Sequence, residues 1–328
     1  MSLDVIDLTK RYGEKTVVDH LSFSMPKPGV YALLGTNGAG KTTTIRMMLG
    51  ILSRDGGQVL WEGKELNPTS CNLGYLAEER GLYPKYPLMD QLMYFAGLRG
   101  VSKDTAKQRI RYLAHRLQVE EYLYPNAGNP PVSPLGGKSF SASRQKKQKP
   151  KLADQLSKGN QQKIQLMTAL LSDPDLIVLD EPLSGLDPVN TDLFKSLIRE
   201  EIEKGKYLIL SSHQMATVEE FCTDLTILDR AKPVLQGNLN QIKKSYGRVN
   251  LSLKVEQDIT PLIRSCGVTL LSEKEYEYRL KVTGEEQANR LLGELIARQI
   301  PVITFDLREP SLHEIFVETV GGERHELD

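Results

Sequence analysis

A short run of glycines, followed by a lysine and a hydroxyl side chain, is the first feature of this sequence that could do chemistry. The segment GTNGAGKT, Gly35 to Thr42, fits the spacing Gly-x4-Gly-Lys-Thr. Glycines let a backbone approach phosphate groups closely, N–H groups supply partial positive charge, and Lys41 adds a full charge. The segment therefore predicts a phosphate-binding loop, with the Thr42 hydroxyl on Mg²⁺. The predicted contacts are Gly35, Asn37, Gly38, Gly40, Lys41, Thr42 and Thr43.

Two adjacent carboxylates follow an apolar run in the segment LIVLDEP, Leu176 to Pro182. The apolar residues predict a buried strand, and ligands of open parallel sheets collect at the carboxyl ends of strands. Asp180 is predicted to bind Mg²⁺, and Glu181 to activate the attacking water as general base. Another apolar strand ends in ILSSH at His213, which is predicted to stabilise the terminal phosphate.

The elements that position these residues are indicated by apolar periodicity. The phosphate loop lies between the apolar run 30–34 and a helix-like segment that begins TTTIRMML, so strand, loop and helix follow in the order that the motif needs. In residues 87–124 the apolar residues recur with the period of a helix. Their apolar positions, among them Ile110, Leu113 and Leu117, predict core packing.

Together with LSKGNQQK, Leu156 to Lys163, these motifs form an ordered set that resembles ATP-binding cassette (ABC) ATPases, the nucleotide-binding subunits of ABC transporters. The resemblance covers roughly residues 2 to 230. It implies an α/β fold, namely a P-loop NTPase domain of the ABC type with a mixed sheet and a helical subdomain. It also implies ATP and Mg²⁺ as ligands, and ATP hydrolysis coupled to transport.

The resemblance assigns roles to residues that no single motif would identify. Tyr12 maps to the aromatic residue that stacks on adenine. Glu78 maps to the glutamine-loop position, which links Mg²⁺ and the attacking water to the membrane subunit. Ser157 and Gly159 map to the signature that faces the phosphates of a second cassette. Asp187, within SGLDP, maps to the loop that communicates across this dimer interface.

Two motifs depart from the family pattern. The signature reads LSKGN in place of LSGGQ, and Glu78 replaces the usual glutamine. Ser157 and Gly159 retain the hydroxyl and the helix N-terminus, so contact with a phosphate is still expected. A carboxylate at Glu78 can still bind Mg²⁺. We interpret both changes as markers of a bacterial export-type subgroup, which includes sodium and drug extrusion systems.

Composition predicts a protein of the cytoplasm. Of 328 residues 26% are charged, and basic and acidic residues both number 42. No apolar run approaches the roughly 18 residues that span a bilayer, so a transporter pore must be a separate polypeptide. We expect the chain to lie peripherally on the inner face of the cell membrane. The scattered cysteines Cys71, Cys222 and Cys266 indicate reduced thiols that pack in the interior.

The expected partners follow from the family resemblance. They are an integral-membrane permease subunit and a second ATP-binding cassette, identical or paralogous. In the implied mechanism two cassettes close on two ATP molecules, and hydrolysis reopens them. Two alternatives stay open: a soluble cassette ATPase that acts on ribosomes or nucleic acid, although nucleic acid is not the expected partner, and a regulatory ATP-binding module without turnover.

Composition and periodicity also predict the domain boundaries. The ATPase domain is expected at 1–229, with a helical subdomain at about 85–172. Within it, residues about 125–151 are rich in Pro, Gly, Ser and basic residues and contain no acidic residue, which predicts a flexible insertion. Three alternatives stay open for its basic run: contact with anionic lipids, binding of nucleic acid or a regulatory partner, and a solvated tether. Residues 230–247 are predicted as a linker.

Residues 248–328 are predicted to form a separate accessory domain. Strands at 249–255, at 268–282 as a pair and at 301–307, with helices at 259–266 and 285–299, give the order βαββαβ of a small ferredoxin-like α+β sandwich. The segment PSLHEIFVETVGG predicts a closing helix, with Leu312, Ile315, Phe316 and Val320 on one face. No nucleophile or phosphate loop accompanies these elements, so the domain is expected to be regulatory, dimer-supporting or purely stabilising.

Overall fold

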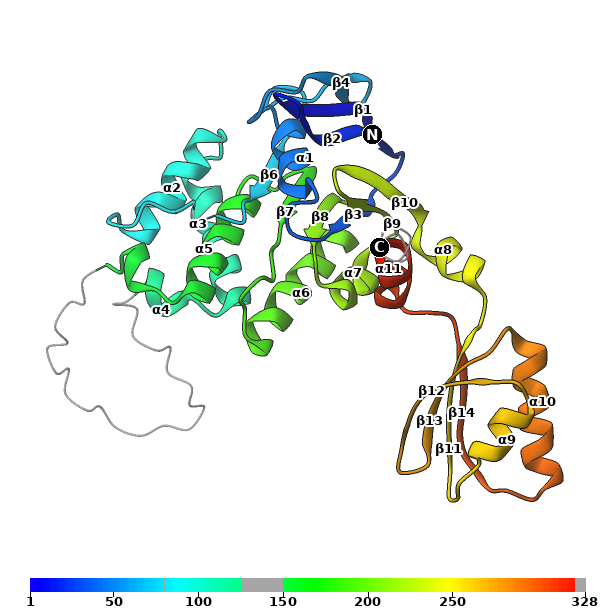
Figure 1. Ribbon diagram of the computed structural model, residues 1–328. Coiled ribbons are helices and arrows are strands. Elements are labelled where there is room, and N and C mark those ends of the chain that lie inside the picture. Colours follow the sequence, from blue (N-terminus) through cyan, green and yellow to red (C-terminus); the bar gives the residue numbers. More distant parts are fainter. Residues whose placement is uncertain (80, 125–149, 322–328) are drawn as a thin grey trace, which may run out of the picture. The chain divides into compact units, whose positions relative to one another are not determined.

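The computed structural model describes residues 1–79, 81–124 and 150–321 (Figure 1). They form two compact units: Met1–His213 with Arg230–Lys232, and Gln214–Asp229 with residues 233–321. The predicted basic insertion at about 125–151 lies outside the described residues except for its last two positions. The domain boundaries at 229 and 248 stay predictions.

An antiparallel sheet in the first unit is built largely from the N-terminal strands, in the order β2-β1-β4-β5. Its strands are β1 (Leu3–Tyr12), β2 (Lys15–Met25), β4 (Gly56–Trp61) and β5 (Lys64–Glu65). Leu3, Val5 and Leu8 of β1 are buried, because a partly covered sheet places its apolar residues on one face. Gly13, with φ of 59°, forms the turn between β1 and β2. Tyr12 therefore lies at the end of a strand, beside a tight turn.

Parallel strands in the first unit follow the order β3-β8-β7-β6. They are β3 (Gly29–Gly35), β6 (Leu73–Leu76), β7 (Leu176–Asp180) and β8 (Tyr207–Ser212). Every residue of β7 and β8 is buried, as expected for strands covered on both faces. In the register, Leu34 pairs with Ser212 and Asp180 pairs with Ser211. The carboxyl ends of β3, β7 and β8 therefore meet at one edge of the sheet.

The helices of the first unit include the predicted helical segment. They are α1 (Lys41–Met48), α2 (Leu88–Leu98), α3 (Lys103–Leu117), α4 (Glu120–Leu123), the short 3₁₀ helix Ala153–Gln155, α5 (Lys158–Leu170) and α6 (Pro188–Glu203). Helix α3 begins after Ser102, whose side chain accepts a hydrogen bond from the backbone N–H of Thr105. The apolar stripe Ile110, Leu113 and Leu117 is buried, which confirms the predicted core face.

The second unit opens with α7 (Met215–Phe221) and ends with α11 (Leu312–Gly321), and these two helices contact one another. Between them lie β9 (Asp224–Asp229), β10 (Lys232–Asn238), α8 (Leu239–Tyr246), β11 (Asn250–Val255), α9 (Thr260–Ser265), β12 (Thr269–Lys274), β13 (Glu277–Lys281), α10 (Glu285–Ala297) and β14 (Val302–Arg308). The predicted closing helix buries Leu312, Ile315 and Val320.

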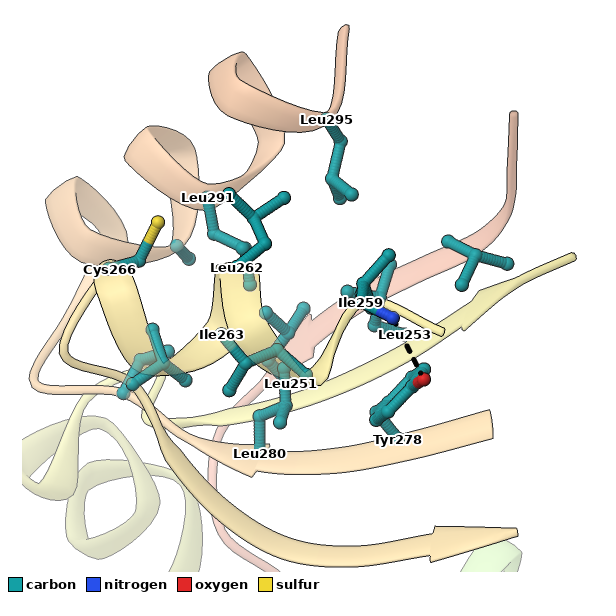
Figure 2. Close-up of a cluster of buried hydrophobic side chains, with 14 residues drawn as sticks. Leu251, Leu253, Ile259, Leu262, Ile263, Cys266, Tyr278, Leu280, Leu291 and Leu295 are labelled. Carbon is teal, nitrogen blue, oxygen red and sulfur yellow. Dashed lines mark hydrogen bonds between the residues drawn. The ribbon is translucent and has the colours of Figure 1, made fainter. Parts of the chain in front are cut away.

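The C-terminal sheet has the order β12-β13-β11-β14, with every neighbouring pair antiparallel. With α9 and α10 in the crossovers, this is the predicted ferredoxin-like βαββαβ sandwich. Figure 2 shows Leu251, Leu253 and Leu280 on the side of the sheet where α9 and α10 pack. The hydroxyl of buried Tyr278 accepts a hydrogen bond from the backbone N–H of Ile259 at 3.1 Å, which ties the sheet to the start of α9.

Candidate active site

The loop after β3 has the shape that the glycine spacing predicts. Strand β3 ends at Gly35, and α1 begins at Lys41. Gly40 has φ of 108°, and a Cβ at this position would lie 2.5 Å from the carbonyl oxygen of Val17. Only glycine fits there without a shift of backbone. The first turn of α1 contains no acidic side chain, so its N–H groups and partial positive charge stay suited to an anion.

Lys41, the first residue of α1, is buried, and its side chain reaches back to the start of the loop. Its ammonium donates hydrogen bonds to the carbonyl oxygens of Gly35 at 2.9 Å and Thr36 at 3.2 Å. The same nitrogen lies 3.5 Å from Oε1 of Glu181, which follows β7. The loop and the end of β7 therefore share one buried cation.

Glu181 has a backbone conformation that is uncommon for a residue with a side chain. Its φ is 48°, in the left-handed region, and such residues persist where the surroundings fix them. Here Ser211 fixes it, because the N–H of Glu181 donates to the Ser211 hydroxyl at 3.0 Å and to its carbonyl oxygen at 3.2 Å. As a result Oε2 of Glu181 lies 2.9 Å from Nδ1 of His213. The carboxylate is therefore held between Lys41 and His213.

Asp180, the last residue of β7, is almost fully buried. Its Oδ1 accepts hydrogen bonds from the hydroxyls of Thr42, at 3.2 Å, and Ser211. Its Oδ2 is also buried and has no hydrogen-bond partner among the described residues. Burial raises the pKa of this carboxyl. An orphaned carboxylate oxygen beside a threonine hydroxyl is a donor set that suits Mg²⁺, so the residues present fit the predicted metal.

The raised pKa of Asp180 predicts that this carboxylate destabilises the fold. A carboxyl whose pKa is higher in the folded state binds more protons there, so stability falls as pH rises above the unfolded pKa, near 4. Asp180→Asn can keep the acceptor oxygen and removes the charge. We expect its free energy of unfolding at pH 7, without nucleotide or Mg²⁺, to exceed that of the wild type by about 1 kcal/mol. Urea titrations at pH 7 and pH 4.5 measure this difference, which should shrink at the lower pH.

Asp173→Asn is the matched control for that experiment. Although burial acts to raise the pKa of Asp173, its ion pair with Lys206, at 2.9 Å, leaves the pKa lowered. Removing this charge should therefore destabilise the protein at pH 7. A loss of stability in Asp180→Asn equal to that in Asp173→Asn would contradict the assignment of an unfavourable buried charge at Asp180.

The other predicted site residues lie at more exposed positions. Tyr12 is exposed at the end of β1, and the ammonium of Lys10 lies 5.3 Å from its ring centroid. An exposed aromatic ring can stack on a planar base. Glu78 follows β6 and is exposed, and none of the described residues forms a hydrogen bond or ion pair with its side chain. The structure thus brings together Lys41, Thr42, Asp180, Glu181 and His213, and leaves Glu78 outside that group.

The predicted signature residues lie at the start of α5. Ser157 is the N-cap, and its hydroxyl accepts a hydrogen bond from the backbone N–H of Asn160 at 3.3 Å. A Cβ on Gly159 would lie 3.3 Å from Nδ2 of Asn190, so glycine permits close packing against α6. Asp187 caps α6, and the hydrogen bond from the N–H of Asn190, at 2.9 Å, lowers the pKa of its carboxyl. The signature and the loop after Glu181 therefore pack together.

Two residues at the site were not predicted. Ser211 binds both Asp180 and Glu181, and the polar end of ILSSH is the signal that could have indicated it. Lys163, on the same face of α5 as Gly159, is 4% exposed, and its ammonium has no hydrogen-bond or ion-pair partner among residues 1–79, 81–124 and 150–321. Burial lowers its pKa, and the nearby charge of Asp187 opposes this effect.

A glycine loop that leads from a parallel strand into a helix, with carboxylates on a neighbouring strand end, marks this chain as a P-loop nucleotide-binding protein. Comparison with known proteins narrows the class. Residues 18–184 match the family described as ABC transporter, and residues 237–320 match the C-terminal domain of DrrA1-3-like ATP-binding proteins. The chain belongs to the ABC transporter family and is an ATP-binding subunit.

Several relatives are similar over nearly the whole chain. The ABC transporter ATP-binding protein YhaQ of Bacillus subtilis is 38% identical, over 98% of this chain and 99% of its own length. The linearmycin resistance ATP-binding protein LnrL of the same organism is 27% identical, over 97% and 98%. A solved structure of an ATP-binding subunit of an ABC transporter, 27% identical, superposes with a TM-score of 0.63 over 75% of this chain and 93% of its own. These similarities confirm the predicted family and fold class.

Proposed function

We propose that this chain hydrolyses ATP and thereby drives a separate membrane permease, in the direction of export. The observation that carries the proposal is the placement of Glu181. Its buried carboxylate lies 3.5 Å from the Lys41 ammonium and 2.9 Å from a nitrogen of His213, at the edge of the sheet where the phosphate loop begins. A water activated there would be next to a phosphoryl group held in the loop.

Each residue of the group has a separate role in the proposed reaction. The N–H groups of the loop and Lys41 bind the phosphates and offset their charge. Glu181 accepts the proton of the attacking water, and His213 orients Glu181 and contacts the terminal phosphate. Asp180 and Thr42 would hold Mg²⁺, which supplies charge neutralisation and alignment of the phosphate oxygens when bound. Tyr12 supplies a surface for the adenine ring.

Closure of two cassettes is the second part of the proposal. The start of α5 offers the capped N-terminus at Ser157, the backbone of Gly159 and the exposed Lys158, all suited to a phosphate of a second cassette. Asp187 lies on the adjoining loop, where it can couple the nucleotide site of one cassette to that of the other. The second cassette is an identical chain or a paralogue.

A surface groove supports contact with a membrane partner. A cavity of about 340 Å³ is lined by Tyr75, Leu82, Phe95 and Leu98, with other residues of β6, α2 and α5. Leu98 is 65% exposed, and Tyr83 beside Leu82 is 50% exposed, so apolar surface is available for a partner helix. Arg46 of α1 donates to Glu79 at 3.1 Å, which connects the loop of Glu78 to the helix that begins at Lys41. This groove is the proposed permease contact.

The proposed location of the chain and the proposed direction of transport have separate support. Among the described residues, no helix combines the length and the apolar character needed to cross a bilayer. We place the chain on the inner face of the membrane, bound to its permease. Export is proposed because relatives include LnrL, named for linearmycin resistance, and the Nod factor export ATP-binding protein I of Ralstonia nicotianae, 31% identical over 73% of this chain and 68% of its own length.

Affinity capture from detergent-solubilised membranes tests the partner. Tagged Glu181→Gln is captured with ATP and Mg²⁺ present, and co-purifying chains are identified by mass spectrometry. We expect a multi-helix membrane protein, and we expect its recovery to fall at least fivefold when Leu98 is replaced by Asp. The control is Ile296→Asp, at another exposed apolar position, on α10. Recovery of ribosomes or RNA in place of a membrane protein would overturn the transporter proposal.

A further inference from the structure

One face of the C-terminal sheet is polar and carries none of the helices of the ferredoxin-like sandwich. In β11 and β13, Leu251, Leu253 and Leu280 belong to the core, and side chains alternate between the faces of a strand. Ser252 and Arg279 therefore point away from α9 and α10. The register pairs Arg279 with Ser252 of β11 and with Ser272 of β12, so two hydroxyl side chains flank this arginine across the sheet.

This polar face forms part of a cavity of about 740 Å³. The cavity is completed by α7, α8 and the start of α11, all within the second unit. Such a volume is that of a site for a small organic molecule. Its lysine and arginine lining residues are Lys243, Arg248, Arg279 and Arg308, His313 lines it as well, and its acidic lining residues are Glu219, Glu309 and Glu314.

Two of the acidic residues are already occupied by contacts of the fold. Glu219 of α7 accepts from Lys243 at 2.6 Å and from the backbone N–H of Leu312 at 3.2 Å. Glu314 accepts from the backbone N–H of Ser311 at 2.7 Å and from the amide of Asn250 at 2.9 Å. These carboxylates cap the start of α11, and therefore they compete little with a ligand for the basic residues.

Arg279 differs from the lysine and the other arginines of the cavity. Lys243 pairs with Glu219, Arg248 with Glu285 and Arg308 with Asp306. Within the described part of the chain, the guanidinium of Arg279 has no hydrogen-bond or ion-pair partner. A guanidinium offers a planar set of donors that matches a carboxylate or a phosphate. Arg279 is thus the anchor that this cavity presents to an anion.

An apolar side chain lies beside this anchor. Leu271 of β12 lines the cavity and is 57% exposed, and it precedes Ser272, which pairs with Arg279 in the register. Removal of an exposed leucine side chain from water by an apolar group is favourable. We propose that the cavity binds an organic anion with an apolar body, whose carboxylate or phosphate pairs with Arg279 while the body covers Leu271. The site lies on the second unit and does not depend on the proposed ATPase function.

Titration of the full chain with decanoate, decanol and inorganic phosphate tests the site by isothermal calorimetry. Decanoate should bind at least tenfold more tightly than decanol, which lacks the charge, and than phosphate, which lacks the apolar body. Arg279→Gln should weaken decanoate binding about tenfold or more. Arg290→Gln, on exposed α10 surface, is the matched control and should bind as the wild type does.

Each outcome decides one part of the inference. Equal binding of decanol and decanoate would remove the anion site, and equal binding of phosphate and decanoate would remove the role of the apolar body. Wild-type affinity in Arg279→Gln would overturn the assignment of the anchor.

ATP affinity, measured in parallel, should be the same in both variants, which separates a failure of this site from a failure of the nucleotide site. A last titration decides whether the bound anion is a free molecule or a lipid headgroup, by comparing free decanoate with vesicles of anionic lipid. Binding to vesicles but not to decanoate would mean that the protein contacts a membrane surface and has no small-molecule site here.

Discussion

Glu181→Gln is expected to lower the rate of ATP hydrolysis by about 10²- to 10⁴-fold, because a general base contributes that much to a rate. Glutamine keeps the size and the acceptor oxygen of the side chain, and Ser211 can still hold its backbone N–H. ATP affinity should therefore change by less than about threefold. Steady-state phosphate release measures the rate, and titration with a fluorescent ATP analogue measures the affinity.

The same variant should accumulate a closed dimer when ATP and Mg²⁺ are present, since closure does not need hydrolysis. Light scattering after size-exclusion chromatography measures this change. Glu203→Gln, an exposed position at the end of α6, is the control and should hydrolyse ATP as the wild type does. Hydrolysis by Glu181→Gln at the wild-type rate would remove Glu181 as the general base.

Lys41→Ala is expected to weaken ATP binding by about 100-fold or more. Truncation of a buried charge that pairs with a ligand costs several kcal/mol, and each 1.4 kcal/mol is a factor of ten. The loop itself should persist, because Gly40 and the start of α1 fix its backbone independently of the lysine side chain. Equilibrium dialysis with ATP and Mg²⁺ measures the affinity.

Loss of the Lys41 ammonium also removes the ion pair with Glu181, so folding must be checked separately. Lys206→Ala is a suitable comparison, because Lys206 is also largely buried and paired with a carboxylate but lies away from the loop. Both variants should lose stability in urea titrations, and only Lys41→Ala should lose ATP affinity. Normal ATP binding by folded Lys41→Ala would contradict the assignment of the phosphate loop.

Local sequence signals predicted the family, the phosphate loop and the elements of the C-terminal sandwich. Glycine spacing is a local signal, because the pattern lies within one short segment; the close approach of Gly40 to Val17, which requires glycine there, is seen only in the structure. Apolar alternation is also local, which is why the strands of the sandwich could be placed within a residue or two. The predicted roles of Tyr12, Glu78, Ser157 and Asp187 came from family resemblance and stay predictions.

Contacts between distant segments were beyond such reasoning. Ser211 meets Asp180 and Glu181 only because β7 and β8 are neighbours in one particular register. Lys163 is buried on the face of α5 where Gly159 lies close to Leu186, and helical periodicity alone does not reveal that contact. The cavity at Arg279 needs β11, β13 and α11 together. In each case the strand register or the packing of helices, and not the residue type, decides the environment.

The contacts of Glu219 bear on where the chain can be shortened, because each truncation removes partners of α7. Glu219 joins α7 to Lys243 of α8 and to the first residue of α11, and α7 begins two residues after His213. A fragment that ends at Asp229, the predicted limit of the ATPase domain, would contain α7 with both partners of Glu219 deleted. A fragment that ends after Tyr246 keeps α8 and therefore the ion pair. Expression of the longer fragment is the sound way to separate catalysis from any influence of the C-terminal sandwich.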